Sequence, residues 1–356
     1  MIPVTKPFLP PLADYQKYVS GIWERNWLTN NGPLVQELEK KLKDSLGVEH
    51  FFFMGNGTIA IQIALKSLGI TKQVITTPFS YVATTSSVIW EGCNPVFADI
   101  NETDFNIDPQ KIEQAITADT EAILATHVYG NPCDVEAIES IAQKHNLKVI
   151  YDAAHAFGCV YKGKNLLAYG DIATCSFHAT KVFHTTEGGA IICHDKKLAD
   201  KVSLQRSFGH VGDEHFSVGI NGKNSEFHAA MGLCNLDHLE QIINCRKTIS
   251  NQYDRLLHPS LQRPVALPGT VYNYAYYPVI LPGEEVLKKV ITKLNSASIY
   301  PRRYFYPSLN TLSYLKKQQS CPVSEKNSLR VLSLPLYVGL QESDVERIAE
   351  IINSSI

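Results

Sequence analysis

The sequence has no long apolar run and no block of like charges. Its apolar stretches fall short of the roughly 18 residues that a membrane-spanning helix needs, and residues 1–7 lack the apolar core of a signal peptide. Lys and Arg total 33 against 35 Asp and Glu, and the formal net charge is −2. Because nucleic acids and anionic membranes attract clustered basic residues, we expect neither as a partner and predict a cytoplasmic protein.

Paired cysteines are also missing. Closely spaced pairs are typical of zinc sites and redox motifs, and disulfide frameworks belong to small secreted domains. The eight cysteines instead stand singly, with no C-x-x-C motif, at positions 93, 133, 159, 175, 193, 234, 245 and 321. We therefore predict buried, reduced thiols and no metal site.

The chain is too long, at 356 residues, for one small hydrophobic core. Hydrophobic residues make up 44% and charged residues 19% of it, which is typical of a globular protein and not of a disordered one. The composition of the sequence changes near residues 245–255, and aromatic, strand-like segments follow. We predict a large domain over residues 1–248 and a smaller C-terminal α/β domain over residues 249–356.

Short apolar strands alternate with helical patterns through the large domain. This alternation predicts an α/β fold whose mostly parallel sheet has helices on both faces. The expected strands are 73–77, 95–98, 122–126, 149–151 and 190–193, and the expected helices are 34–46, 59–68, 82–90, 109–116, 135–145 and 196–206. Ligands of such sheets bind at the carboxyl ends of the strands, the places of Thr58, Tyr81, His127 and Asp152. Beyond these we expect a long helix over 227–246, a strand-like segment over 272–280, and helices over 285–297 and 345–352.

Lys181 is the candidate for chemistry. It ends the stretch Ser176-Phe177-His178-Ala179-Thr180-Lys181, shortly before a Gly-Gly pair and an apolar run. Small polar neighbours in that setting predict a turn that holds the amine over a cleft, where it could form a Schiff base. Taken alone, such a residue is more often a solvated surface lysine.

Asp152 supplies the partner that changes this interpretation. It follows the apolar run 147–150, at the predicted carboxyl end of a strand, and Lys181 comes about thirty residues later. Pyridoxal 5′-phosphate (PLP) chemistry requires this pair of residues. The carboxylate keeps the pyridine nitrogen protonated, and the lysine holds the aldehyde and moves a proton. The sequence therefore predicts PLP as cofactor.

Two further features suit that cofactor. The turn Gly55-Asn56-Gly57-Thr58 leads into the helical pattern 59–68, and backbone N–H groups at a helix start can bind phosphate. A tight turn would need glycine without any phosphate, so this signal is weak by itself. Tyr81 follows a strand end and could stack on the pyridine ring, although a core tyrosine is the competing interpretation.

These segments together resemble the DegT/DnrJ sugar-nucleotide aminotransferases, a group of fold-type I enzymes. The resemblance runs from Gly32-Pro33 through residues 56–58, 152–155 and 176–181 to Gly219-Ile220-Asn221. It implies that Lys181 is the Schiff-base lysine, Asp152 the partner of the pyridine nitrogen and Tyr81 the stacking ring. It further implies contacts of His155 with the ring or its phenolic oxygen, and a phosphate site built from Gly57, Thr58, Ser176 and, from the neighbouring subunit, Asn221. A homodimer with shared active sites follows from that last residue.

The chain departs from the family pattern at three places. Asn56 stands where serine is common, His184 where asparagine is frequent, and Gly222-Lys223 where a Tyr-Arg pair is usual. These changes leave the cofactor assignments intact and put the details around Asn221 in doubt.

The segments 4–12, 27–30 and 130–134 are similar to those of family members that form dTDP-4-amino-4,6-dideoxyglucose. This similarity implies that L-glutamate gives its amino group to a dTDP-4-keto-6-deoxyhexose, for O-antigen and lipopolysaccharide sugars. Amination at C3 of a dTDP-3-keto-6-deoxyhexose is the alternative, because enzymes of both kinds share the cofactor motifs.

Two other functions are compatible with the fold. A sugar dehydratase of this family would carry histidine in place of Lys181, and a non-catalytic PLP-binding regulator would need no matched lysine and aspartate. Arg302 and Arg303 stay open, because they could meet a diphosphate or form an exposed basic turn.

Overall fold

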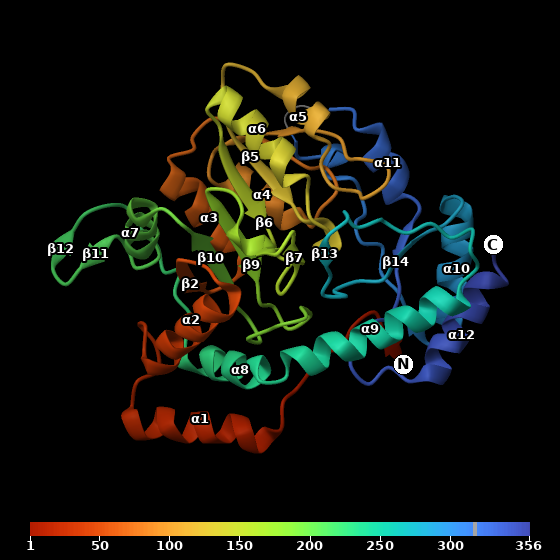
Figure 1. Ribbon diagram of the computed structural model, residues 1–356, viewed down its shortest axis with the longest axis horizontal. Helices are drawn as coiled ribbons and strands as arrows, with labels where there is room; N and C mark the ends of the chain where they lie inside the picture. The colour runs from red at the N-terminus through yellow and green to blue at the C-terminus, as the bar shows by residue number, and fades with distance from the viewer. Residues whose placement is uncertain (316–318) are drawn as a thin grey trace.

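A seven-stranded sheet lies at the centre of the computed structural model, which describes residues 1–315 and 319–356 (Figure 1). Six strands run parallel, and β10 alone runs antiparallel to both of its neighbours in the sheet. In spatial order the strands are β2 (His50–Met54), β10 (Gly189–Cys193), β9 (Ile172–Ser176), β6 (Lys148–Asp152), β5 (Thr120–Thr126), β3 (Gln73–Thr76) and β4 (Asn94–Phe97). The predicted α/β class with a mostly parallel sheet is confirmed.

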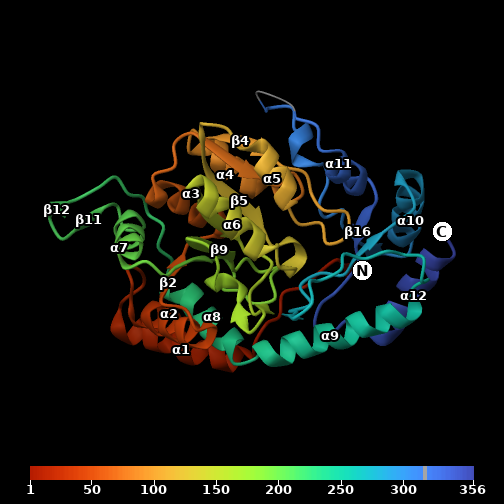
Figure 2. The same cartoon turned by 45° about the horizontal axis from the view of Figure 1, so that its top comes forward.

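Helices cover both faces of this sheet and form a hydrophobic core on each (Figure 2). Because both faces are covered, central strands such as β5 and β10 are almost wholly buried and read as apolar runs. One face carries α2 (Pro33–Leu46), α5 (Pro109–Ala115), α6 (Val135–His145) and α8 (Glu226–Leu236), and the other carries α3 (Gly57–Leu68), α4 (Val82–Trp90) and α7 (Lys196–Gln205).

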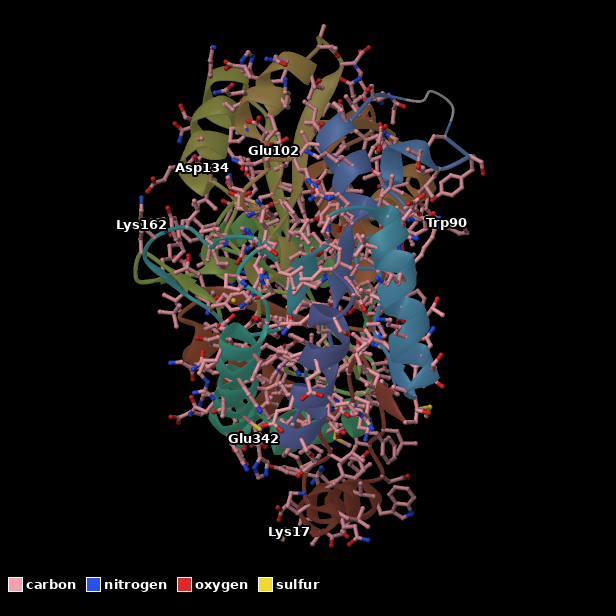
Figure 3. All side chains as sticks on the ribbon, turned by 90° about the vertical axis from the view of Figure 1, so that its right-hand side faces the viewer. Lys17, Trp90, Glu102, Asp134, Lys162 and Glu342 are labelled. Atoms are coloured by element: carbon pink, nitrogen blue, oxygen red, sulfur yellow. The ribbon has the colours of Figure 1, made fainter. Side chains whose placement is uncertain are left out.

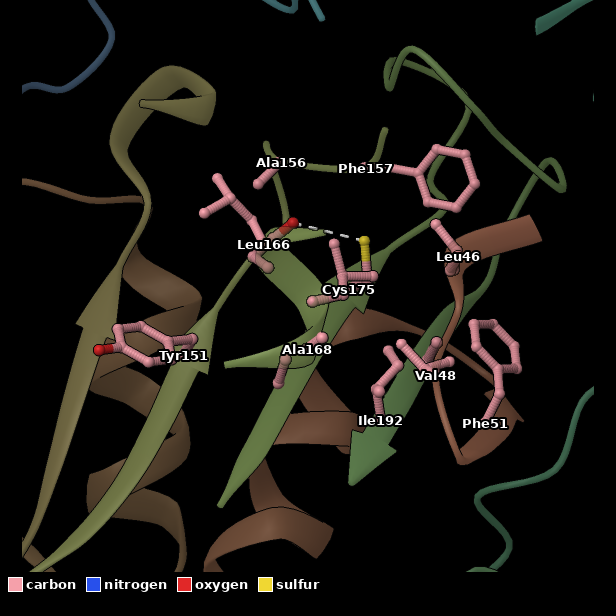
Figure 4. Close-up of a cluster of buried hydrophobic side chains, with 14 of the residues drawn as sticks. Leu46, Val48, Phe51, Tyr151, Ala156, Phe157, Leu166, Ala168, Cys175 and Ile192 are labelled. Carbon is pink, nitrogen blue, oxygen red and sulfur yellow. Dashed lines mark hydrogen bonds between the residues drawn. The ribbon is translucent and has the colours of Figure 1, made fainter. Parts of the chain in front are cut away.

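Figure 4 shows part of the first of these cores. This core includes Tyr151 of β6, Phe157 of the loop after β6, Leu166 of the 3₁₀ turn 166–168 and Ile192 of β10. The Cys175 thiol donates to the carbonyl of Ala153 at 3.4 Å, the dashed line of the figure. All eight cysteines fall in the described part of the chain and are free thiols, and seven of them are buried.

A second core lies beside the sheet and is built mainly from the C-terminal third of the chain. Its long helix α9 (Leu239–Leu256) leads away from the sheet in Figure 1. The other members are α10 (Glu284–Ser296), α12 (Glu342–Asn353) and the strand pairs β14 (Pro278–Ile280) with β16 (Val331–Ser333) and β1 (Ile2–Pro3) with β15 (Ile299–Tyr300). The predicted division after residue 248 stays a prediction; α9 spans it, and β1 joins the second core from the N-terminal end.

The remaining elements are short, apart from the surface helix α1 (Leu12–Arg25), which packs on α8. Figure 3 shows Lys17 of α1, Glu102, Lys162 and Glu342 spread over different parts of the periphery. Within residues 1–315 and 319–356, no helix has the length and apolar character to cross a membrane. The short elements are β7 (Val160–Tyr161), β8 (Lys164–Asn165), β11 (His210–Val211), β12 (Glu214–His215), β13 (Thr270–Val271), α11 (Pro322–Ser328) and the 3₁₀ turns η1 (Val128–Gly130), η2 (Leu166–Ala168) and η3 (Leu309–Thr311).

Two expected elements are wrong. The helix predicted over 227–246 is two helices, α8 and α9, which meet at Asp237–His238, where two poor helix formers adjoin. The segment 272–280 is a strand only at its end. Arg246 of α9 donates to the carbonyls of Tyr274 at 2.8 Å and Ala275 at 2.6 Å, so a side chain takes the place of a neighbouring strand.

Candidate active site

One cavity of about 350 Å³ brings together seven of the eight predicted site residues. It lies at the carboxyl edge of the sheet, because Asp152 ends β6, Ser176 ends β9 and the start of α3 follows β2. The seven residues are Gly57, Thr58, Tyr81, Asp152, His155, Ser176 and Lys181. The expected location of ligands at this edge of a parallel sheet is thus found here as a cavity.

Lys181 lies in the irregular return between β9 and β10, and its Nζ is 3.4 Å from the Tyr276 hydroxyl. Burial acts to lower the pKa of this amine, because it penalises the charged form. The Tyr276 phenol and the Asp152 carboxylate act in the other direction and leave the pKa above its usual value. The amine is therefore held as a cation in a buried cavity beside a carboxylate.

Asp152 is the carboxylate of this pair. Burial raises its pKa, and hydrogen bonds from the Thr84 hydroxyl at 2.7 Å and the Ala154 N–H at 3.1 Å act to lower it, as does the charge of Lys181. Behind it, the hydroxyl of Thr126 donates to Ser80 at 3.2 Å, and the hydroxyls of Ser80 and Thr84 are 2.9 Å apart. A chain of hydroxyls from three segments thus supports one carboxylate oxygen.

His155 forms part of the opposite wall. Its ring lies nearly parallel to Phe305, with centroids 5.4 Å apart, and edge-on to Tyr276. Burial, together with the nearby charge of Lys181, holds its pKa well below the usual value, so the imidazole is neutral. Its Nδ1 is buried and has no hydrogen-bond partner among the described residues. A buried polar atom without a partner beside a cavity indicates that a ligand completes its contacts.

The start of α3 forms a cradle for an anion. The Asn56 side chain accepts from the N–H of Ile59 at 2.8 Å and fixes the first turn. A Cβ on Gly57 would lie 3.0 Å from the Cβ of Ser176, and one on Gly189 would lie 2.5 Å from the carbonyl carbon of Asn56. These two glycines allow the turn to pass directly over β9 and β10, so the helix start faces the cavity beside Ser176.

Tyr81 precedes α4, and its exposed ring lines the cavity. Two other expected positions lie outside. His127 is buried beneath the site, where it stacks on Tyr151 and its Nδ1 accepts from the N–H of Cys133 at 3.0 Å. Asn221 is exposed at the base of the β11–β12 hairpin, where it pairs with Ser207, and does not line the cavity of its own chain.

Sequence reasoning missed several residues of the site. These are Thr84, one turn into α4, and Tyr276 and Tyr304 from the C-terminal third of the chain. Arg302, which the sequence left open between a diphosphate contact and an exposed basic turn, also lines the cavity. Thr84 could have been found from its place just after a predicted strand end. Tyr276 and Tyr304 carry no local signal, because only the packing of the second core against the sheet brings them to the cavity.

The arrangement can hold a flat aromatic ring with an anionic tail. The helix start at Gly57 and the Ser176 hydroxyl suit the tail, and Asp152 suits a protonated ring nitrogen. The fold and the site together are those of an enzyme with a lysine amine and a carboxylate side by side in one cavity.

The chain belongs to the DegT/DnrJ/EryC1/StrS aminotransferase family, whose model matches residues 12–353. It is 42% identical to the dTDP-4-amino-4,6-dideoxy-D-glucose transaminase of Shigella dysenteriae, over 98% of this chain and 97% of that protein. The Escherichia coli protein of the same name is 41% identical, over 99% and 98%. A solved structure of DesI with its TDP-sugar product is 30% identical, has a TM-score of 0.94, and overlaps 99% of this chain and 92% of that one. The predicted family, its aminotransferase fold and the assignment as an aminotransferase are confirmed.

Replacing Tyr276 by Phe should lower the pKa of the Lys181 amine, because the phenol is the largest of the influences that raise it. The pH dependence of acetic anhydride labelling at Lys181, followed by peptide mass mapping on protein stripped of small molecules, measures this change. Half-maximal labelling should move to lower pH in Tyr276→Phe. Tyr81→Phe is the matched control, since Tyr81 lines the same cavity without a hydrogen bond to Lys181. An unchanged curve for Tyr276→Phe would show that the contact does not act on the amine.

Proposed function

We propose that this protein is a PLP-dependent aminotransferase that moves the amino group of L-glutamate to a dTDP-4-keto-6-deoxyhexose and forms dTDP-4-amino-4,6-dideoxyglucose. The observation that carries the chemistry is the buried Lys181 amine facing Asp152 in one cavity. The choice of sugar rests on the two relatives at 42% and 41% identity, which are named for this product. We further propose that the product serves O-antigen and lipopolysaccharide sugars and that the reaction takes place in the cytoplasm.

The residues present fit PLP. Gly57, Thr58 and Ser176 would hold its phosphate, Tyr81 would cover one face of the ring, and Asp152 would bind the pyridine nitrogen. His155, whose buried Nδ1 lacks a partner among the described residues, would contact the ring or its phenolic oxygen. When bound, the cofactor supplies an aldehyde carbon for the amine and a protonated ring that accepts electrons.

The chain's own contribution is to place and move protons. In the first half of the reaction, the Lys181 Nζ would take the proton from the α-carbon of the amino donor and deliver it to the carbon on the other side of the transferred nitrogen. In the second half it would move a proton in the reverse direction, onto the sugar carbon. Tyr276 keeps this amine in place at 3.4 Å. Asp152 would keep its partner nitrogen protonated. Burial leaves the pKa of this carboxyl above its usual value, and Thr84, Ala154 and Lys181 act against that and favour the ionised carboxylate.

Aromatic side chains exclude water from this amine. Tyr276, Tyr304 and Phe305 line the cavity on the side of the second core, with Tyr129 packed behind Phe305 at a centroid distance of 5.6 Å. A dry wall of this kind strengthens the attraction between Lys181 and Asp152 and protects the amine from competing proton donors.

We also propose a homodimer in which the partner's Asn221 completes the phosphate site. The β11–β12 hairpin stands away from the body in Figures 1 and 2. Exposed apolar side chains lie in the hairpin and on both sides of it in the sequence, namely Phe208, Val211, Phe216, Val218 and Ile220. An apolar arm of this size is typical of a protein interface, and Asn221 lies at its base.

Borohydride reduction of the protein incubated with PLP should attach a pyridoxyl group to Lys181, because this amine faces the anion cradle and Asp152. Peptide mass mapping locates the group. Lys181→Ala should lose the label and still fold, whereas Lys164→Ala, which changes a surface lysine over Tyr169, should keep it. A label on another lysine would contradict the assignment.

Offered ¹⁵N-glutamate and the two dTDP-linked 6-deoxyhexoses separately, the enzyme should aminate the 4-keto sugar and not the 3-keto sugar. NMR of the product locates the new C–N bond. Amination at C3 alone would overturn the C4 assignment and keep the sugar aminotransferase. If neither sugar reacts while glutamate still converts the cofactor to its amine form, the sugar assignment is wrong.

Mixing inactive Lys181→Ala protein with inactive Asn221→Ala protein should restore activity, because one site of each mixed dimer then has both native residues. Dissociation and reassociation are followed by mass spectrometry, and activity is measured on the mixture. Mixed dimers that form and remain inactive would exclude a site shared through Asn221.

A further inference from the structure

Arg302 is a cation of the cavity that the proposed mechanism does not use. It follows β15, and its side chain lines the same cavity as Lys181. Its backbone pairs with Ser333 of β16 through hydrogen bonds of 3.1 Å and 2.8 Å, so the residue is fixed at the edge of the second core. Its guanidinium lies over the Tyr304 ring, 5.3 Å from the centroid. The backbone pairing fixes the residue, and the guanidinium of this solvent-exposed side chain lies against the ring.

No carboxylate of the described residues forms an ion pair with Arg302, and its side chain makes no hydrogen bond to them. The two acidic residues that line the cavity contact other groups. Asp152 accepts from Thr84 and Ala154, and Glu187 lies 3.6 Å from the His178 ring. A guanidinium placed in a cavity without a counter-ion favours an oxyanion from a ligand.

The other arginines nearby differ from it in this respect. Arg303 points away, forms an ion pair with Glu284 at 3.4 Å and stacks on Tyr306. Arg246 is buried and donates to two backbone carbonyls. Of these three arginines, Arg302 alone lines the cavity with Lys181 and has no partner for its side-chain donors within the described chain.

We propose that Arg302 is the oxyanion-binding residue of the cavity, taking a carboxylate of the amino donor or the diphosphate of the sugar nucleotide. The inference rests on the proposed function, since both substrates must visit the cavity in turn with their reacting carbon at Lys181. Both also carry oxyanions: glutamate has a carboxylate next to its reacting carbon, and the sugar nucleotide has a diphosphate at the far end of the sugar ring. The planar guanidinium suits carboxylate and phosphate alike, because each offers two oxygens to its two parallel N–H groups.

Calorimetric titration of the PLP-loaded protein with glutarate and, separately, with pyrophosphate tests the proposal without any turnover. Arg302→Gln should weaken the binding of at least one probe about tenfold or more, because a charge-assisted pair is lost. Arg302→Lys should weaken it less, since the charge stays and the two-pronged geometry is lost. Arg303→Gln is the matched control and should bind both probes as the native protein does. Thermal unfolding of each variant verifies folding, which the backbone pairing with Ser333 should preserve.

The outcomes identify the source of the oxyanion. Loss confined to glutarate assigns Arg302 to the amino donor, loss confined to pyrophosphate assigns it to the sugar nucleotide, and loss of both assigns it to each in turn. Native affinity for both probes in Arg302→Gln, or no binding of either probe to the native protein, overturns the proposal. If the probes depend on Arg302 and neither keto-sugar is aminated, the sugar assignment falls while the oxyanion site stands.

Discussion

The buried carboxylate of Asp152 requires partners from several segments of the chain, and much of the structure serves to bring them together. Asp152 lies at the end of β6, the middle strand of the sheet, and water cannot solvate its charge. Removing a charge from water costs several kcal/mol unless partners replace the lost hydration. The replacements come from three places: the α4 hydroxyl of Thr84, the Ala154 N–H and the amine of Lys181. Each of these requires its own segment to be correctly placed, so one electrostatic demand links the sheet, α4 and the lysine turn.

Some parts of the site could be predicted from the sequence and others could not. Asp152, Tyr81 and Thr58 could be grouped from their order along the chain, because parallel strands bring their carboxyl ends to one edge. Ser176 was assigned only through the family resemblance, since no strand was predicted ahead of it. Lys181 joined them through the chemistry that pairs a lysine with a carboxylate. The aromatic wall and Arg302 come from segments whose placement depends on how the second core docks, and a local pattern contains no information about docking.

The fold shows the same division. The helices over 82–90 and 135–145 were predicted with their observed bounds, because each has local signals: a strand end ahead of the first and Asp134 as a cap before the second. The segment 272–280 has the composition of a strand and is mostly irregular. There Arg246, far away in sequence, occupies the carbonyls that a ladder would use. Tertiary contacts override propensity where a side chain satisfies the backbone.

The reversed direction of β10 has a topological consequence for Lys181. Two parallel neighbours would need a crossover that carries the chain to the opposite edge of the sheet, a dozen or more residues with a helix. Because β9 and β10 are antiparallel, residues 177–188 leave and return at the same edge, and Lys181 stays beside the carboxyl ends of its neighbours. The direction of β10 therefore keeps the Lys181 amine at this edge of the sheet. Over evolutionary time, insertions should accumulate in the surface loops and be selected against in residues 177–188, because an insertion there would move Lys181 away from the strand ends.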